Sequence, residues 1–86
     1  MASMPTHVPL LMPELDLSPR QAVTVSCWLI PLGREVCEGD RLLELSAGEV
    51  LVDLSAPATG MLAQRAVSEG EVVRANQVLG VIQAES

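Results

Sequence analysis

Apolar residues recur with a period of two along several short segments of the chain. In residues 23–27, two Val and one Cys alternate with Thr and Ser, and a similar alternation occurs in residues 43–45 and 50–54. Such alternation is typical of strands that bury one face. Turn-forming residues separate these segments at intervals of roughly eight to twelve residues, at Gly33, Gly39, Asp40, Gly48, 57–60, Gly70 and Asn76. We therefore predict an all-β fold, a small sandwich or barrel without a substantial helix.

The apolar content suffices for one small core. The chain has 86 residues, of which 49% are hydrophobic, and Trp28 is its only Trp, Tyr or Phe. A chain of this length has room for a single domain. Aliphatic side chains must fill the core, and we expect Trp28 to pack into it instead of serving as a platform for a ligand.

The net negative charge and the absence of lysine argue against several functions. Eleven acidic and five basic residues give a formal net charge of −6, and all five basic residues are arginine. An acidic chain repels phosphate backbones, so we expect no nucleic-acid partner. Without lysine, the chain has no amine for a Schiff base, a general base or an amide-linked cofactor on a side chain. A protein partner would need a basic surface, and its binding would weaken as the salt concentration rises.

The remaining polar residues do not indicate catalysis or a metal site. His7 is the only histidine, and Cys27 and Cys37 lie ten positions apart, unlike a redox pair or half of a zinc site. We expect both thiols to be reduced and structural, and we predict no enzyme activity, catalytic residue or metal ligand. Four acidic residues near the glycine turns lack the spacing of a calcium loop, and we interpret them as a solvated rim: Glu38, Asp40, Glu69 and Glu71.

The amino-terminal residues lack the basic region of a signal peptide. The longest apolar stretch, around residues 22–32, is interrupted by polar residues and proline. Because a membrane span needs a longer apolar run, we expect a cytoplasmic protein without membrane contact.

The two halves of the chain resemble each other at a shift of 37 residues. This shift places Gly33 on Gly70, Val36 on Val73 and Leu42 on Leu79. Neither half has enough strands to bury its apolar face alone. We therefore predict two quasi-equivalent halves that interlock around a pseudo-two-fold axis, the alternative being chance similarity between short Val, Leu and Gly segments.

Residues 44–54 predict a tight β-hairpin with Gly48 and Glu49 at its centre. A type II′ turn requires positive φ at its first central residue, which glycine adopts readily. In this register, each inward-facing pair is apolar: Ala47 with Val50, Leu45 with Val52, and Leu43 with Leu54. A slip of one residue would bury Ser46 and Asp53 instead. The register therefore places Glu49 at an exposed tip, with Glu44 and Asp53 opposite each other on the solvent side.

Six fragments stand out by their order and spacing: residues 11–15 (LMPEL), 28–30 (WLI), 33–36 (GREV), 38–42 (EGDRL), 56–62 (APATGML) and 69–73 (EGEVV). Together they resemble the biotinyl and lipoyl carrier domain family, especially the lipoyl domain of 2-oxo acid dehydrogenase acyltransferases. The long segment 15–22 resembles the lipoyl branch. The resemblance covers about residues 8–83, which we expect to form one lipoyl-like domain between flexible segments 1–7 and 84–86.

The resemblance implies a flattened barrel of two four-stranded antiparallel sheets with a pseudo-two-fold axis. It also implies an Asp-Lys pair at the hairpin tip, where the lysine would carry lipoate or biotin. Counted back from Ala56 and Pro57, the lysine position holds Glu49 and the aspartate position holds Gly48. We therefore expect a vacated attachment site and no cofactor.

Two functions fit this sequence. In the first, a degenerate, non-lipoylated lipoyl-like domain acts as a protein-binding module that docks to components of a 2-oxo acid dehydrogenase complex. In the second, it is a structural amino-terminal domain or spacer of a larger dihydrolipoamide acyltransferase-type enzyme.

Overall fold

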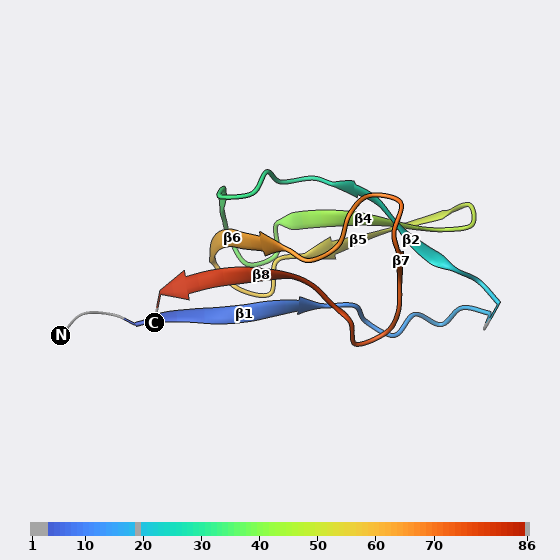
Figure 1. The fold of residues 1–86 in the computed structure, drawn as a ribbon, viewed down its shortest axis with the longest axis horizontal. Coiled ribbons are helices and arrows are strands. Elements are labelled where there is room, and N and C mark those ends of the chain that lie inside the picture. The colour runs from blue at the N-terminus through green and yellow to red at the C-terminus, as the bar shows by residue number, and fades with distance from the viewer. Residues whose placement is uncertain (1–3, 19, 86) are drawn as a thin grey trace.

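The computed structural model describes residues 4–18 and 20–85, and these form strands and loops without a helix. No helix in this part of the chain is long and apolar enough to cross a membrane. The eight strands, drawn in Figure 1, are β1 (Pro5–Leu11), β2 (Val23–Trp28), β3 (Glu35–Val36), β4 (Arg41–Ala47), β5 (Val50–Ser55), β6 (Gly60–Arg65), β7 (Val72–Val73) and β8 (Val78–Glu85).

The strands form two four-stranded sheets, in the orders β1-β8-β6-β3 and β5-β4-β2-β7. All pairs are antiparallel, which confirms the predicted fold class. Each sheet takes strands from both halves of the sequence: β3 pairs with β6, and β7 pairs with β2. Strand pairing also extends beyond the expected limits of 8 and 83, because Pro5 faces Glu85 across β1 and β8. Residues 1–3 and 86 of the expected flexible ends lie outside the described residues.

The predicted repeat is confirmed by the hydrogen bonds that join the halves. The Gly33 amide donates to the Leu62 carbonyl over 2.8 Å, and the Gly70 amide donates to the Val25 carbonyl over 2.7 Å. These four residues are pairs under the 37-residue shift. A β-bulge follows Val25 in β2 and another follows Leu62 in β6. The two halves therefore have β-bulges at equivalent positions, in addition to equivalent strands.

Equivalent turns before β4 and β8 are stabilised by different side chains. The Cys37 amide donates to the Asp40 carboxylate over 2.8 Å. In the other half, the Arg74 amide donates to the Gln77 side-chain carbonyl over 2.9 Å. An oxygen acceptor three residues ahead satisfies the amide in both cases, so Asp and Gln are interchangeable for this purpose.

The core lies between the two sheets and is aliphatic, as predicted. Its largest fully buried side chains come from both halves: Val25, Leu42, Leu43, Leu45, Leu62, Leu79 and Ile82. No buried side-chain nitrogen or oxygen among the described residues is without a hydrogen-bond partner. This satisfies the requirement that polar atoms removed from water be paired.

Trp28 and Arg65, which are equivalent under the 37-residue shift, contact each other. The Trp28 indole Nε1 donates to the Val67 carbonyl over 3.0 Å, and the Arg65 guanidinium donates to the Ile30 carbonyl. The acceptors are themselves equivalent residues. The guanidinium carbon lies 5.3 Å from the indole ring centroid, within the range of a cation–π contact. Trp28 is thus a buried packing residue, as expected.

Asn76 provides a test of the turn before β8. Its φ is 69°, and that of the equivalent Gly39 is 93°. A Cβ is strained in this region, although Asn tolerates it better than most residues. Asn76→Ala is expected to lower the free energy of unfolding by about 1 kcal/mol, whereas Asn76→Gly should not lower it. Urea denaturation followed by Trp28 fluorescence measures both. Equal destabilisation by the two variants would show that the Asn76 side chain, and not the backbone strain, decides the stability of the turn.

Candidate functional site: the tip of the central hairpin

The β4–β5 hairpin has the predicted register. Its inward-facing pairs are Leu43 with Leu54, Leu45 with Val52, and Ala47 with Val50. The agreement follows from side-chain polarity, because a slip of one residue would exchange the apolar and polar faces of both strands. Gly48 and Glu49 are therefore the two central residues of the turn, as predicted.

The turn has the backbone geometry of type II′. Gly48 has a φ of 64°, and Glu49 is not among the residues with positive φ. The loop before β2 approaches this turn: a Cβ added to Gly48 would lie 3.0 Å from the Gln21 side-chain oxygen. The yellow-green turn between β4 and β5 and the cyan loop before β2 lie toward the same end of the molecule (Figure 1). The first central position therefore favours glycine both for its φ and for its closeness to Gln21.

The tip extends beyond the core. Ala47 is buried, but its partner Val50 is 53% exposed and the adjacent Leu51 is 60% exposed. The inward orientation expected for Val50 therefore gives it little burial, because the opposite sheet does not cover this end of the hairpin. Glu49 is exposed as well, as predicted.

The acidic residues on the solvent side of the hairpin differ in their partners. Glu44 and Asp53 face each other as predicted. The Ser26 hydroxyl donates to Glu44 over 3.0 Å, and Arg41 forms a 3.0 Å ion pair with Asp53. These contacts offset the like-charge repulsion expected across the pair. Within the described residues, the Glu49 carboxylate has no hydrogen-bond or ion-pair partner.

Three acidic residues of the expected rim bind backbone amides. Asp40 accepts from the Cys37 amide, Glu69 from the Trp28 amide over 3.2 Å, and Glu71 from the Ser68 amide over 3.1 Å. Across residues 4–18 and 20–85, no group of three or more His, Cys, Asp or Glu side chains has a geometry that could hold a metal ion. His7 is exposed on β1, Cys27 is half-buried and Cys37 is exposed.

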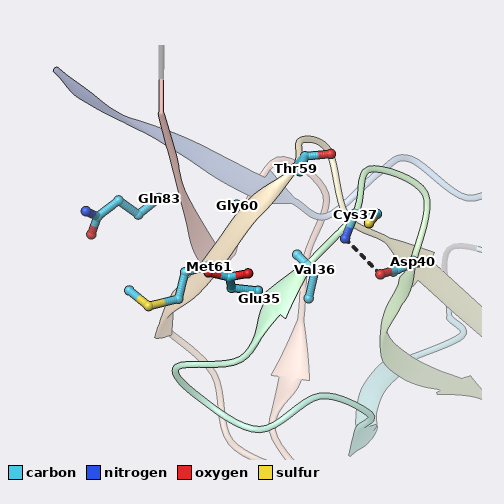
Figure 2. Close-up of a pocket in the computed structure, with 8 residues that line it drawn as sticks. All are labelled: Glu35, Val36, Cys37, Asp40, Thr59, Gly60, Met61 and Gln83. Atoms are coloured by element: carbon cyan, nitrogen blue, oxygen red, sulfur yellow. Dashed lines mark hydrogen bonds between the residues drawn. The ribbon is translucent and has the colours of Figure 1, made fainter. Parts of the chain in front are cut away.

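An open depression at the far end of the same hairpin was not predicted from the sequence. It is lined by Glu35, Val36, Cys37, Asp40, Thr59, Gly60, Met61 and Gln83 (Figure 2). Its polar groups hold local structure: the Asp40 carboxylate binds the Cys37 amide, and the Thr59 hydroxyl accepts from the Glu38 amide over 2.9 Å. No alternation or motif could have indicated it, because its walls come from four separate segments.

The paired four-stranded sheets, their pseudo-two-fold axis and the tight central hairpin define the class of lipoyl and biotinyl domains. The family model described as "Biotin-requiring enzyme" (Biotin_lipoyl) matches residues 10–82. The chain therefore belongs to this family.

Similar proteins are described as components of an enzyme complex or of an enzyme system. The chain is 32% identical over 76 residues to the dihydrolipoyllysine-residue succinyltransferase component of the 2-oxoglutarate dehydrogenase complex of Buchnera aphidicola, covering 88% of this chain and 19% of that protein. It is 31% identical over 78 residues to the dihydrolipoyllysine-residue acetyltransferase component of the acetoin cleaving system of Cupriavidus necator, covering 91% and 21%. The chain thus spans only a small part of these relatives.

A solved structure shares the fold. It is described as a single-chain, multi-domain long-chain acyl-CoA carboxylase and matches with a TM-score of 0.65 and 26% identity, over 81% of this chain and 8% of that one. The chain therefore has the fold of a carrier module whose relatives belong to larger enzymes.

Substitutions at the turn test its geometry. Gly48→Ala is expected to lower the free energy of unfolding by about 1–2 kcal/mol because of the positive φ. Glu49→Ala, on the same turn, should change it by less than about 0.5 kcal/mol. Adding Gln21→Ala to Gly48→Ala relieves the side-chain contact but not the backbone strain, so recovery should be partial. Urea denaturation of the four proteins, with wild type as reference, measures these values; a fully stable Gly48→Ala variant would contradict the type II′ assignment.

Proposed function

We propose that this chain is a lipoyl-like domain that carries neither lipoate nor biotin and acts instead as a non-catalytic protein-binding module. The observation that supports the loss of carriage is the chemistry of the hairpin tip. The hairpin keeps its register and its two-residue turn, yet Glu49 stands at the position that the family resemblance assigns to the modified lysine. A carboxylate cannot form the amide that joins lysine to either cofactor, and the sequence has no lysine elsewhere.

The proposed partners are components of 2-oxo acid dehydrogenase complexes. Support comes from relatives described as components of 2-oxoglutarate dehydrogenase complexes, including one from Bartonella vinsonii that is 35% identical over 72 residues. The net charge of −6 favours a basic docking surface on the partner. Binding of this kind uses the surface of the domain and requires no covalent cargo.

The second candidate is a structural lipoyl-like domain or spacer within a larger acyltransferase-type enzyme. It is favoured by the small share of its relatives that the chain spans, 19% and 21% for two of them. In that case chemistry would lie in other parts of the protein, and the isolated domain would bind no dehydrogenase subunit.

Mass spectrometry after incubation with lipoate ligase, lipoate and ATP tests the loss of carriage. The wild-type mass should remain unchanged. Glu49→Lys should gain one lipoyl group, because it places an amine at the tip of the retained hairpin. Glu38→Lys places an amine on a different exposed turn and is the matched control, expected to stay unmodified. Modification of the wild type would overturn the proposal. An unmodified Glu49→Lys variant would show that the surface read by the ligase has also changed.

Retention of purified subunits on the immobilised domain tests docking. Dehydrogenase and acyltransferase subunits of a 2-oxoglutarate dehydrogenase complex should be retained at low salt and released as salt rises, because screening weakens attraction to an acidic surface. An arginine-rich protein without relation to these complexes is the control for non-specific attraction. Absence of retention at low salt would favour the spacer.

A further inference from the structure

Strands β1 and β5 are equivalent edges of the two sheets. Each lies at the end of its sheet, in the orders β1-β8-β6-β3 and β5-β4-β2-β7. Leu10 of β1 faces Gly80, and Leu54 of β5 faces Leu43. Gly80 and Leu43 are related by the 37-residue shift, so Leu10 and Leu54 occupy equivalent positions. β5 contacts only β4 among the strands that the structure describes.

The direction of the backbone amides is the same on both edges. The Met12 amide donates to the Gln77 carbonyl, and the equivalent Ala56 amide donates to the Asp40 carbonyl. Amides alternate in direction along a strand. Every second residue before Met12 and Ala56 therefore directs its amide toward the neighbouring strand, and the residues between them direct theirs outward. The outward positions are Pro5, His7, Pro9 and Leu11 on β1, and Leu51, Asp53 and Ser55 on β5.

Prolines protect one of these edges and not the other. Pro5 and Pro9 have no N–H, so β1 offers an added strand only the amides of His7 and Leu11, which Pro9 separates. On β5, the equivalent positions of Leu51 and Asp53 retain their outward amides. The other two edges, β3 and β7, have two residues each. Within the described residues, β5 is thus the one long edge whose row of outward amides is not interrupted by proline.

The side chains around this edge favour a particular kind of strand. Leu51 and Val50 are 60% and 53% exposed, which provides apolar surface. Asp53 lies on β5, Glu49 lies in the turn directly before it, and Glu44 faces Asp53 from β4. Arg41 is the cation paired with Asp53. A second copy of this chain, itself with a net charge of −6, would bring more carboxylates to this edge, whereas a cationic strand would offset them.

We propose that β5 is a docking edge for an extended segment of another protein in which cationic and apolar residues alternate. The segment pairs with the outward backbone groups of Leu51 and Asp53 and adds a fifth strand to the sheet. Its cationic residues lie on the outer face, near Asp53 and Glu49, and their aliphatic stems cover Leu51. Its apolar residues lie on the inner face beside Val50 and Val52. The inference rests on the proposed protein-binding function and identifies the surface and the chemistry of the partner.

A capped peptide of alternating arginine and valine is the probe. Titrated into the ¹⁵N-labelled 86-residue chain, it should shift the amide resonances of Leu51 and Asp53 most strongly, and binding should weaken as salt rises. A peptide of the same composition with its arginines and valines in separate blocks controls for charge alone. A peptide of alternating glutamate and valine should not bind.

Proline substitution separates edge pairing from general attraction. Leu51→Pro removes an outward amide and no bond to β4, so it should weaken binding of the arginine–valine peptide by about tenfold, as expected for the loss of a paired amide. His7→Pro, at the equivalent position on β1, is the matched control and should bind as wild type does. Trp28 fluorescence and urea denaturation check that both variants are folded.

A charge exchange tests the same edge if Leu51→Pro does not fold. Asp53→Arg should weaken binding of the arginine–valine peptide and allow the glutamate–valine peptide to bind. Strongest shifts on any other strand, or equal binding of the block and alternating peptides, would overturn the proposal. So would a concentration-dependent dimer whose formation shifts the β5 amides without peptide, because the occupant would then be a second copy.

The retention experiment distinguishes this inference from the function on which it rests. Retention of dehydrogenase-complex subunits by wild type and by Leu51→Pro alike would place docking on another surface and overturn the β5 inference alone. Peptide binding at β5 without retention of any subunit would support the edge and refute the proposed partners.

Discussion

Every strand arrangement in this molecule depends on the exchange of short strands between two equivalent halves. β3 of the first half pairs with β6 of the second, and β7 of the second pairs with β2 of the first. Backbone hydrogen bonds from Gly33 to Leu62 and from Gly70 to Val25 stabilise this pairing between the halves. Because each sheet contains strands from both halves, neither half can bury its leucines alone, and the apolar core and the interlocked topology must form together. The contact between Trp28 and Arg65 joins equivalent positions of the two halves in the same way.

The alternation of polar and apolar residues and the spacing of glycines predicted those parts of the fold that depend on short segments of sequence. The hairpin register followed from the alternation in residues 43–54, and the repeat followed from the spacing of Gly33 and Gly70. The equivalence of β1 and β5 was not predicted, because the loop before β2 is longer than the loop before β6 and the 37-residue shift therefore fails for the first strand. The closeness of Gln21 to Gly48 and the depression near Cys37 depend on segments far apart in sequence, for which periodicity gives no signal.

At the hairpin tip, the backbone geometry and the chemical reactivity depend on different residues. Shape depends on the register, the positive φ of Gly48 and the burial of Ala47, all of which are present. Chemistry depends on one side chain at an exposed position, where substitution costs little stability. The proposed replacement of the family's lysine by Glu49 would therefore leave the fold undisturbed. The fold alone consequently identifies the family but does not establish the function, which depends on the residues placed on it.

The two long edges of the molecule illustrate different ways to avoid unwanted pairing. Pro5 and Pro9 remove two of the outward donors of β1, which disfavours pairing with an additional strand. β5 keeps its donors, and the carboxylates of Asp53 on this strand and of Glu49 in the turn before it disfavour a second copy of this acidic chain. Charge is a selective barrier, because it disfavours acidic strands and favours cationic ones. The residues that protect β5 against self-association would therefore also specify the partner that it accepts.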